Sequence, residues 1–238
     1  MCKANGKKAN SKGVRTAIQD LSLKSMTNFI PIFPLAIVVF PGEQLNLHIF
    51  EPRYKQLIQE CASQQKPFGI PAVINNQVQE LGTLVQIAEI KKIYEDGKMD
   101  ISTRGLKVFR MLELIKQIPD KLYSGAIVSY PDDADDGSRS LMQKVVSGIK
   151  DLHKLLEVTK DFKKPEEELK SFDVAHHMGL NLEEEYELLN LFRELQRQEY
   201  LKRHLNKVIP LLSEMETLKE KVKLNGHFKN LSGFQFED

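Results

Sequence analysis

Apolar and polar residues alternate along the first half of the chain, and this pattern predicts β-strands. The clearest case is 45–50, where leucine or isoleucine occupies every second position. Further strands are expected at 72–74, 84–94, 99–111 and 123–128, with turns at Asn75-Asn76 and Glu95-Asp96-Gly97. Gly105 interrupts the pattern at a point typical of a β-bulge. Several short strands at this spacing predict a small, strongly bent sheet or barrel.

A short helix is predicted directly after the strand at 45–50. Pro52 is suited to the first helical position, where its missing N–H costs nothing. The apolar residues that follow lie at helical spacing and are Tyr54, Leu57, Ile58 and Cys61. A strand is therefore expected to pass directly into an amphipathic helix.

The second half of the chain has the apolar period of helices. A long helix is expected to begin near Ser138, with one apolar face formed by Leu141, Val145, Ile149, Leu152 and Leu156. Ser171 should cap a short helix that Gly179 closes. Asn181 with Glu184 makes a capping-box start for the next helix.

The last helical stretch carries apolar residues seven positions apart. These residues are Leu201, Val208, Met215 and Val222, with Leu205 and Leu212 between them. Pro210 is expected to kink this helix or to begin a new one, and Asn225-Gly226 should end it. The spacing suits pairing with a second copy, while packing on the barrel is the simpler use of the stripe.

An acidic segment rich in breakers, residues 131–137, separates the two halves and is interpreted as a solvated linker. The predicted fold class is α+β, a β pseudo-barrel with a short helix followed by a helical bundle. We predict a disordered basic tail at 1–28, the barrel at 29–131, the helical part at 137–224 and a tail at 225–238. Met26 is a candidate for the natural start of the protein.

Basic and acidic residues nearly balance, with 34 Lys and Arg against 33 Asp and Glu. The chain therefore lacks an overall basic field of the kind that attracts nucleic acid or anionic membranes. No apolar run approaches the roughly 20 residues of a spanning helix, so we predict no membrane association. Cys2 and Cys61 lie in unlike settings, which predicts no disulfide, a reducing compartment and a cytoplasmic location.

Several residue groups invite a chemical interpretation, and each has a plainer one. Adjacent His176 and His177 would point about 100° apart on a helix, which disfavours a shared metal ion. Cys61 lies on the apolar face of the predicted short helix and is interpreted as a buried thiol that packs in the core. The acids of the linker lack the glutamate of a calcium loop. With no G-x-x-x-x-G-K-[ST] motif and no serine–lysine pair in a catalytic setting, we predict no enzyme, no cofactor and no metal.

The segment with the most structural signals is IPIFPLAIVVFPGEQLNLHIFEPRY, residues 30–54. Pro31 and Pro34 hold its entry extended, and Phe40-Pro41-Gly42 forces a turn. This segment, from Pro31 onward, closely resembles the opening of the Lon protease amino-terminal domain family. Further matches are Gly82-Thr83, Asp96-Gly97, Ile101, Gly105, Phe109-Arg110 and DVAHHMGLNLEEEYELL at 173–189, so the resemblance covers about residues 29 to 210.

The resemblance implies a PUA-like pseudo-barrel and a substrate-binding module without the ATPase and peptidase domains of Lon. The residues that it marks, as structural or peptide-binding positions, are Pro34, Leu35, Phe40, Pro41, Gly42, Phe50, Glu51, Arg53 and Tyr54. For Glu51, Arg53 and Tyr54 two interpretations stay open. The favoured one is an internal salt bridge and cap that fix the strand-to-helix corner, and the other is direct contact with a ligand.

The resemblance further implies a non-catalytic module that binds unfolded or extended protein segments and assists protein quality control or proteolysis, with a protease machine as a further partner. The alternative is an RNA-associated role, because PUA-like barrels also occur in RNA-binding proteins. Basic residues near the predicted strands fit that alternative, namely Lys91, Lys92, Arg104, Lys107 and Arg110. An uncapped strand edge and exposed apolar residues would favour protein binding.

Overall fold

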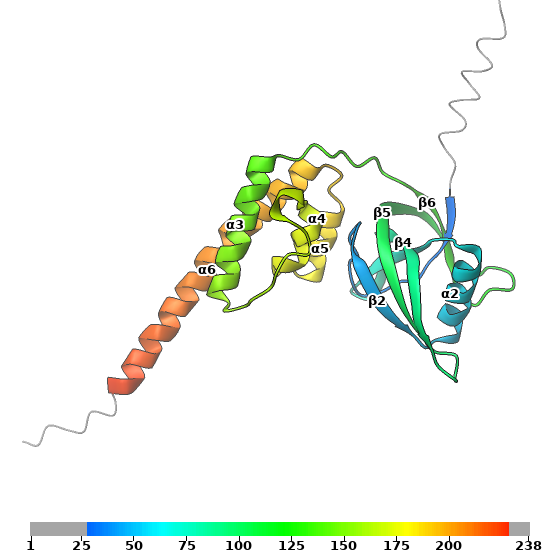
Figure 1. The fold of residues 1–238 in the computed structure, drawn as a ribbon, viewed down its shortest axis with the longest axis horizontal. Helices are drawn as coiled ribbons and strands as arrows, with labels where there is room; N and C mark the ends of the chain where they lie inside the picture. Colours follow the sequence, from blue (N-terminus) through cyan, green and yellow to red (C-terminus); the bar gives the residue numbers. More distant parts are fainter. Residues whose placement is uncertain (1–27, 229–238) are drawn as a thin grey trace, which may run out of the picture.

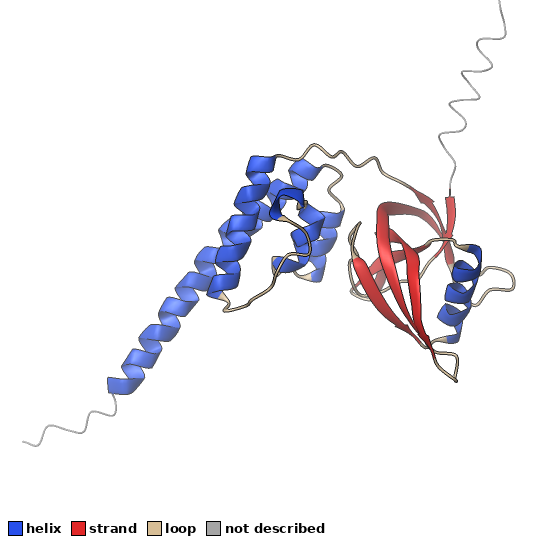
Figure 2. Cartoon of the chain, viewed as in Figure 1, coloured by secondary structure: helices blue, strands red, loops and turns tan. Residues whose placement is uncertain are grey.

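A computed structural model of the chain describes residues 28–228, in which a β-barrel and a group of helices lie side by side (Figure 1). Strands gather in the barrel, and α2 is the helix that packs with them (Figure 2). The predicted α+β fold, a barrel with a short helix followed by a helical bundle, is confirmed. The tails predicted at 1–28 and 225–238 fall mainly on 1–27 and 229–238, outside the described residues.

Six strands form one antiparallel sheet that closes on itself. The strands are β1 Asn28–Pro31, β2 Gln44–Ile49, β3 Phe68–Ile74, β4 Gln77–Ile93, β5 Met99–Ile115 and β6 Gly125–Ser129. Their order is β1-β6-β5-β4-β3, and β2 pairs with the first part of β5. Bridges from Ile32 to Gly69 and from Leu35 to Ala72 join the chain after β1 to β3 and so close the barrel.

The far ends of β4 and β5, together with β2, form a three-stranded part of the sheet, residues 44–49, 86–93 and 99–104, which we call the arm. Its hairpin turn contains Gly97 at φ +76°, and the β3–β4 turn holds Asn75 and Asn76 at φ +51° and +60°. The β4–β5 register shifts next to Gly105, which confirms the predicted bulge. A Cβ at Gly105 would collide with the carbonyl oxygen of Phe40, so this close approach requires glycine.

Helix α2, Pro52–Gln64, buries Tyr54, Leu57, Ile58 and Cys61, the four residues that helical spacing predicted. It lies on the side of the barrel away from the other helices (Figure 1). Glu51 is the N-cap residue, as the corner interpretation expects, although the N–H groups of Tyr54 and Lys55 donate to its backbone carbonyl rather than to its side chain. The Glu51 carboxylate instead pairs with Arg53 at 2.7 Å.

The helical part is built on α3, Arg139–Leu155, and α6, Glu194–Phe228. Short helices lie between them: η1 Glu166–Glu168, α4 Ser171–Val174, η2 Ala175–His177 and α5 Leu182–Leu189. Val145 and Ile149 of α3 are buried in one core with Leu201 and Leu205 of α6. The capping box of Asn181 and Glu184 is confirmed, because each side chain accepts a hydrogen bond from the other residue's backbone N–H.

Some helix predictions are wrong in detail. Leu156 follows the last turn of α3 and is 47% exposed, so it is not on the buried face. Of the two expectations for Pro210, a new helix is wrong, because α6 is one helix of 35 residues that runs through this proline, and the kink stays a prediction. The same helix continues through Asn225-Gly226 to Phe228, since one glycine costs a helix only about 1 kcal/mol. Beyond Leu212 its apolar residues Met215 and Val222 are exposed, so only the earlier part of the stripe, with Leu201 and Leu205, is packed, in a core that also contains residues of the barrel.

The acidic linker is mostly exposed to solvent as predicted, but its side chains also bind the helical part. Asp133 pairs with Arg197 at 2.7 Å, Asp135 with Lys170 at 2.6 Å, and Asp136 with Arg193 at 2.5 Å. The backbone N–H groups of Ala134 and Glu194 donate to the carbonyl oxygens of Phe192 and Ala134, respectively. The linker therefore reaches the start of α6 as an ordered strap (Figure 1).

Candidate functional site

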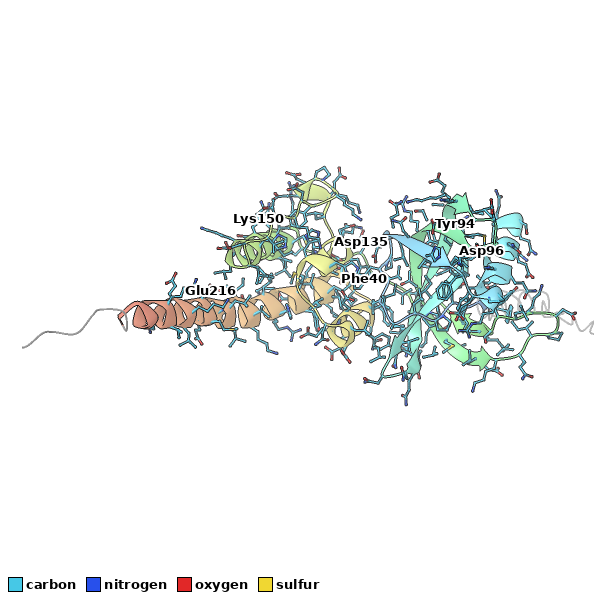
Figure 3. All side chains as sticks on the ribbon, turned by 90° about the horizontal axis from the view of Figure 1, so that it is seen from below. Phe40, Tyr94, Asp96, Asp135, Lys150 and Glu216 are labelled. Carbon is cyan, nitrogen blue, oxygen red and sulfur yellow. The ribbon has the colours of Figure 1, made fainter. Side chains whose placement is uncertain are left out.

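The barrel and the helical part meet at the turn Phe40–Glu43, and we call this contact the seam. The Phe40 side chain is fully buried and stacks on Phe172, with ring centroids 5.1 Å apart. The Arg197 guanidinium lies 4.2 Å from the centroid of the Phe172 ring. Figure 3 shows Phe40 at the junction of the two parts. A residue of the barrel turn is thus part of the core of the helices.

The conformation of the turn follows from its own sequence. Gly42 adopts φ +85°, which favours glycine, and the Glu43 N–H donates to the Phe40 carbonyl at 3.1 Å. The Glu43 carboxylate accepts a hydrogen bond from the Phe40 N–H at 2.9 Å. Gly105 fixes the turn on β5, because it exchanges backbone hydrogen bonds with Gly42 and Glu43 at 2.9 and 2.8 Å.

A buried ion pair supports the helical side of the seam. The side chains of Arg197 and Glu194 are 5% and 2% exposed, and they lie 3.0 Å apart. Ser171 donates its N–H and its hydroxyl to Glu194 at 2.8 and 2.6 Å, and Arg197 also binds Asp133 and the Leu191 carbonyl. Ser171 is therefore the first residue of α4 rather than its predicted N-cap, which is Lys170. Each buried charge has several partners, as burial requires.

His176 bridges the two parts of the molecule. Its Nδ1 lies 2.8 Å from Glu185 of α5 and its Nε2 lies 3.2 Å from Glu43 of the turn. The hydrogen bonds to Glu185 and then to Glu43 raise the pKa of His176 to about 9. At neutral pH this side chain is therefore a cation that holds two carboxylates.

His177 has the opposite character. Burial, followed by the nearby Lys160 charge, lowers the pKa of His177 to about 4, and its Nδ1 has no hydrogen-bond partner. Among residues 28–228, no cluster of three or more His, Cys, Asp or Glu side chains is suited to a metal ion. Cys61 is buried, and burial raises the pKa of its thiol to about 11, so it is protonated at neutral pH and a poor nucleophile.

A groove of about 630 Å³ opens beside the seam, and we call it the seam groove. Pro41, Gly42, Gln44 and Arg104 line its barrel side. The loop 160–164, Phe172 and His176 line its helical side. A second cavity of about 270 Å³ shares Pro41, Gly42 and Phe172 with it. The turn of the signature segment therefore lies between two hollows.

The outer face of the arm continues from the groove. Gln44, Asn46 and His48 of β2 stand opposite Arg104, Ser102 and Asp100 of β5. Gln44 donates to Ser102 at 2.8 Å, and Lys91 donates to Asn46 at 2.9 Å. Asp100 binds His48 at 2.6 Å and Tyr94 at 2.7 Å, toward the arm tip, where Figure 3 labels Tyr94 and Asp96. This polar face leads from the groove toward Phe50, which is 58% exposed.

The structure separates the residues that the signature marks. Phe40, Pro41 and Gly42 belong to the seam, and Phe50 lies at the tip of the arm. Pro34 is partly buried, and Leu35 packs into the barrel core. Glu51, Arg53 and Tyr54 form the strand-to-helix corner at the start of α2 and do not line the groove.

At the corner, Tyr54 is 7% exposed and stacks on Phe33 with centroids 3.9 Å apart. The Arg53 guanidinium lies 4.5 Å from the Tyr54 ring centroid and pairs with the exposed Glu51. Burial raises the pKa of Tyr54. Two smaller effects follow, because the Arg53 charge lowers this pKa and the Glu51 charge raises it.

The helical side of the groove was missed by sequence reasoning. Phe172, Lys160 and Lys163 carry no local motif, and Arg104 was noted only as one basic residue among several. The available signal was the spacing of Glu194 and Arg197, an acid and a base three residues apart on one helix.

A third hollow, of about 420 Å³, lies among α3, η1 and α6. Several of its charged side chains pair within the protein, as Lys150 does with Glu166 at 2.6 Å and Lys170 with Asp135 at 2.6 Å. It contains none of the signature residues. The seam groove is therefore the stronger candidate for a binding site.

Comparison with known protein families shows to which family this chain is related. Residues 30–207, more than half of the chain, match the model of the ATP-dependent protease La (LON) substrate-binding domain. The chain belongs to this family. The Lon resemblance seen in the signature segment is thereby confirmed, and it extends through the barrel and most of the helical part.

Individual relatives agree with the family. The Lon protease of Parabacteroides distasonis is 29% identical over an alignment of 138 residues that covers 55% of this chain and 16% of that protease. The Lon N-terminal domain protein from Xanthomonas campestris superposes with a TM-score of 0.56 at 23% identity, covering 73% of this chain and 96% of that one. The N terminal domain of Mycobacterium avium complex Lon protease gives 0.54 at 13% identity, covering 75% and 98%. These structures share the fold of this Lon-type domain.

Within the described part of the chain, no helix is long and apolar enough to cross a membrane.

Proposed function

We propose that this chain is a recognition module that holds unfolded or extended protein segments in the seam groove, without catalytic chemistry of its own. The observation that carries the proposal is the groove itself, which the most characteristic turn of the family signature forms together with the helices. Membership of the Lon substrate-binding family supports a role beside a proteolytic machine.

The groove suits an extended chain because a strand edge begins in it. β2 pairs only with β5 among the described strands, so its other edge has free backbone groups, and Gln44 at its start lines the groove. An extended segment can add to such an edge through main-chain hydrogen bonds. The free edge of β4 is less suitable, because bulges and Lys91 with Lys92 interrupt it.

A titration with a labelled protein in native and permanently unfolded forms tests the proposal. We expect the intact chain to bind the unfolded form and not the native one, as measured by fluorescence anisotropy. Ala88→Trp, which places a large ring in the groove, should weaken binding about tenfold, since a ring-sized blockage removes about 1.4 kcal/mol or more of contact.

Gln117→Trp is the matched control, because Gln117 is exposed on the barrel and lies outside the groove lining. Equal affinity for native and unfolded forms would contradict the proposal, and so would equal effects of the two tryptophans. The RNA-associated alternative predicts binding of single-stranded RNA that weakens steeply with salt. The absence of RNA binding at low salt would remove that alternative.

A further inference from the structure

The lining of the seam groove carries more positive than negative charge. Its cations are Arg104, Lys160, Lys163, Lys164 and His176, and its acids are Glu43 and Asp173. Both acids are already paired, Glu43 with His176 at 3.2 Å and Asp173 with Lys164 at 2.7 Å. The remaining cations therefore set the charge of the groove.

These remaining cations face the groove from both sides. Arg104 stands on β5, while Lys160 and Lys163 belong to the loop before η1. Within residues 28–228, none of the three forms an ion pair, and Lys160 donates only to the His176 carbonyl at 2.9 Å. All three residues are exposed. An anionic ligand would supply the counter-charges that the described protein does not.

The groove offers little to a nucleic acid base. Single-stranded nucleic acids bind through free aromatic faces as well as through cations. The aromatic ring of Phe172 in this lining already stacks on Phe40 and carries the Arg197 guanidinium. The chain as a whole has a net charge of only +1. The local excess of cations therefore fits a protein ligand better than an extended polyphosphate.

We propose that the seam groove selects extended protein segments rich in Asp and Glu, an inference that rests on the proposed function and names its substrate class. Successive side chains of an extended chain point to opposite sides, so a run of acids can reach Arg104 on one wall and Lys163 on the other. Complementary charge of this kind gives selectivity and faster association.

Three labelled peptides of equal length and identical apolar residues test the inference with the full chain. One carries Asp and Glu at its polar positions, the second Asn and Gln, and the third Lys. We expect the acidic peptide to bind about tenfold more tightly than the amide peptide at low salt, and this advantage should shrink as salt screens the charges. A single-stranded oligonucleotide serves as competitor.

A charge-reversal pair identifies the binding surface. Arg104→Glu with Lys163→Glu should abolish the preference for the acidic peptide. Lys116→Glu with Lys144→Glu changes the net charge equally at exposed positions outside the groove and should leave the preference intact. Circular dichroism spectra that match the wild-type spectrum confirm that both variants fold.

Each outcome has one meaning. Equal binding of the acidic and amide peptides would overturn the charge inference and leave the proposed function standing. Binding of none of the peptides would overturn both. An oligonucleotide that displaces the acidic peptide and binds more tightly than it would overturn the inference in favour of a phosphate ligand. Equal effects of the two charge-reversal pairs would show that net charge, not this groove, selects the peptide.

Discussion

The seam and the strand-to-helix corner come from the same short stretch of sequence, but different forces hold them together. At the corner, Arg53 pairs with Glu51 two residues away, and both side chains are exposed. At the seam, Phe40 stacks on Phe172 and the buried Arg197 covers that ring, so residues far apart in the chain meet out of water. The ion pair of the corner is local, whereas the contacts of the seam exist only when the whole domain folds.

This difference bears on where a binding site can form. The corner has polar groups that look functional in the sequence, yet it lies outside the groove. The seam presents Pro41 and Gly42 to a hollow whose other wall comes from the helical part. Because the two walls come from different parts of the molecule, the residues of the helical wall can change to suit a ligand without altering the barrel.

Replacing one arginine at each place tests the comparison most strongly. Arg197→Ala should lower the free energy of unfolding by about 4 kcal/mol, because Glu194 would keep a buried charge without its partner. Arg53→Ala should lower it by only about 0.5 kcal/mol, because its partner is solvated. Denaturant unfolding followed by circular dichroism measures both values.

A second substitution tests the physical reason for that effect. Glu194→Gln in the Arg197→Ala background removes the buried charge and should recover part of the lost stability. If the two arginine variants lost equal stability, the buried pair would contribute no more than a surface pair, and the contrast between seam and corner would be wrong.

Two phenylalanines of the signature provide the next test. Phe40→Ala should cost about 3 kcal/mol, because it leaves a cavity where a fully buried ring stacks on Phe172. Phe50→Ala should change stability by at most about 0.5 kcal/mol, because that ring is 58% exposed. Limited proteolysis should cut the 131–137 segment faster in Phe40→Ala, since the seam would loosen. Unchanged proteolysis and stability would show that the seam contributes nothing.

The barrel was predictable from the sequence because its signals are local. The alternation of apolar and polar residues predicted which side chains of β2 face the core. Gly97, Asn75 and Asn76 predicted turns, and all three adopt positive φ in those turns. Helical spacing identified the whole buried face of α2, from Tyr54 onward. In each case the neighbours that determine the conformation lie within a few residues.

The seam was not predictable in the same way, because its partners are distant. Ser171 has the preference of an N-cap, but Glu194 takes both of its donors, so the residue enters the helix instead. Composition predicts that the acids of the linker are solvated, as most of them are, but nothing nearby in the sequence shows that Asp136 and Asp133 pair with Arg193 and Arg197. A local pattern can identify a residue as polar but cannot name a partner that only the fold supplies.

The smallest effect concerns pH. The pKa of His176 is raised from 6.5 to about 9 in the folded protein, so its stabilising contribution is complete below pH 6.5 and is lost as the pH rises through 9. Because the side chain is 39% exposed, solvent screening leaves about 1 kcal/mol of the contribution. His176→Gln should therefore be less stable than the wild type at pH 6 and nearly equal to it at pH 10, in denaturant titrations at both values.

His48 offers a matched control on the arm, where it binds Asp100 at 2.6 Å with half of its side chain exposed. His48→Gln should change stability by at most about 0.5 kcal/mol at either pH. A deficit of His176→Gln that persisted at pH 10 would mean that the neutral imidazole, which has a single N–H to donate, already makes the stabilising contact with Glu43 or Glu185. The charge of His176 would then add nothing to the seam, which would depend on uncharged contacts such as the packing of Phe40 on Phe172.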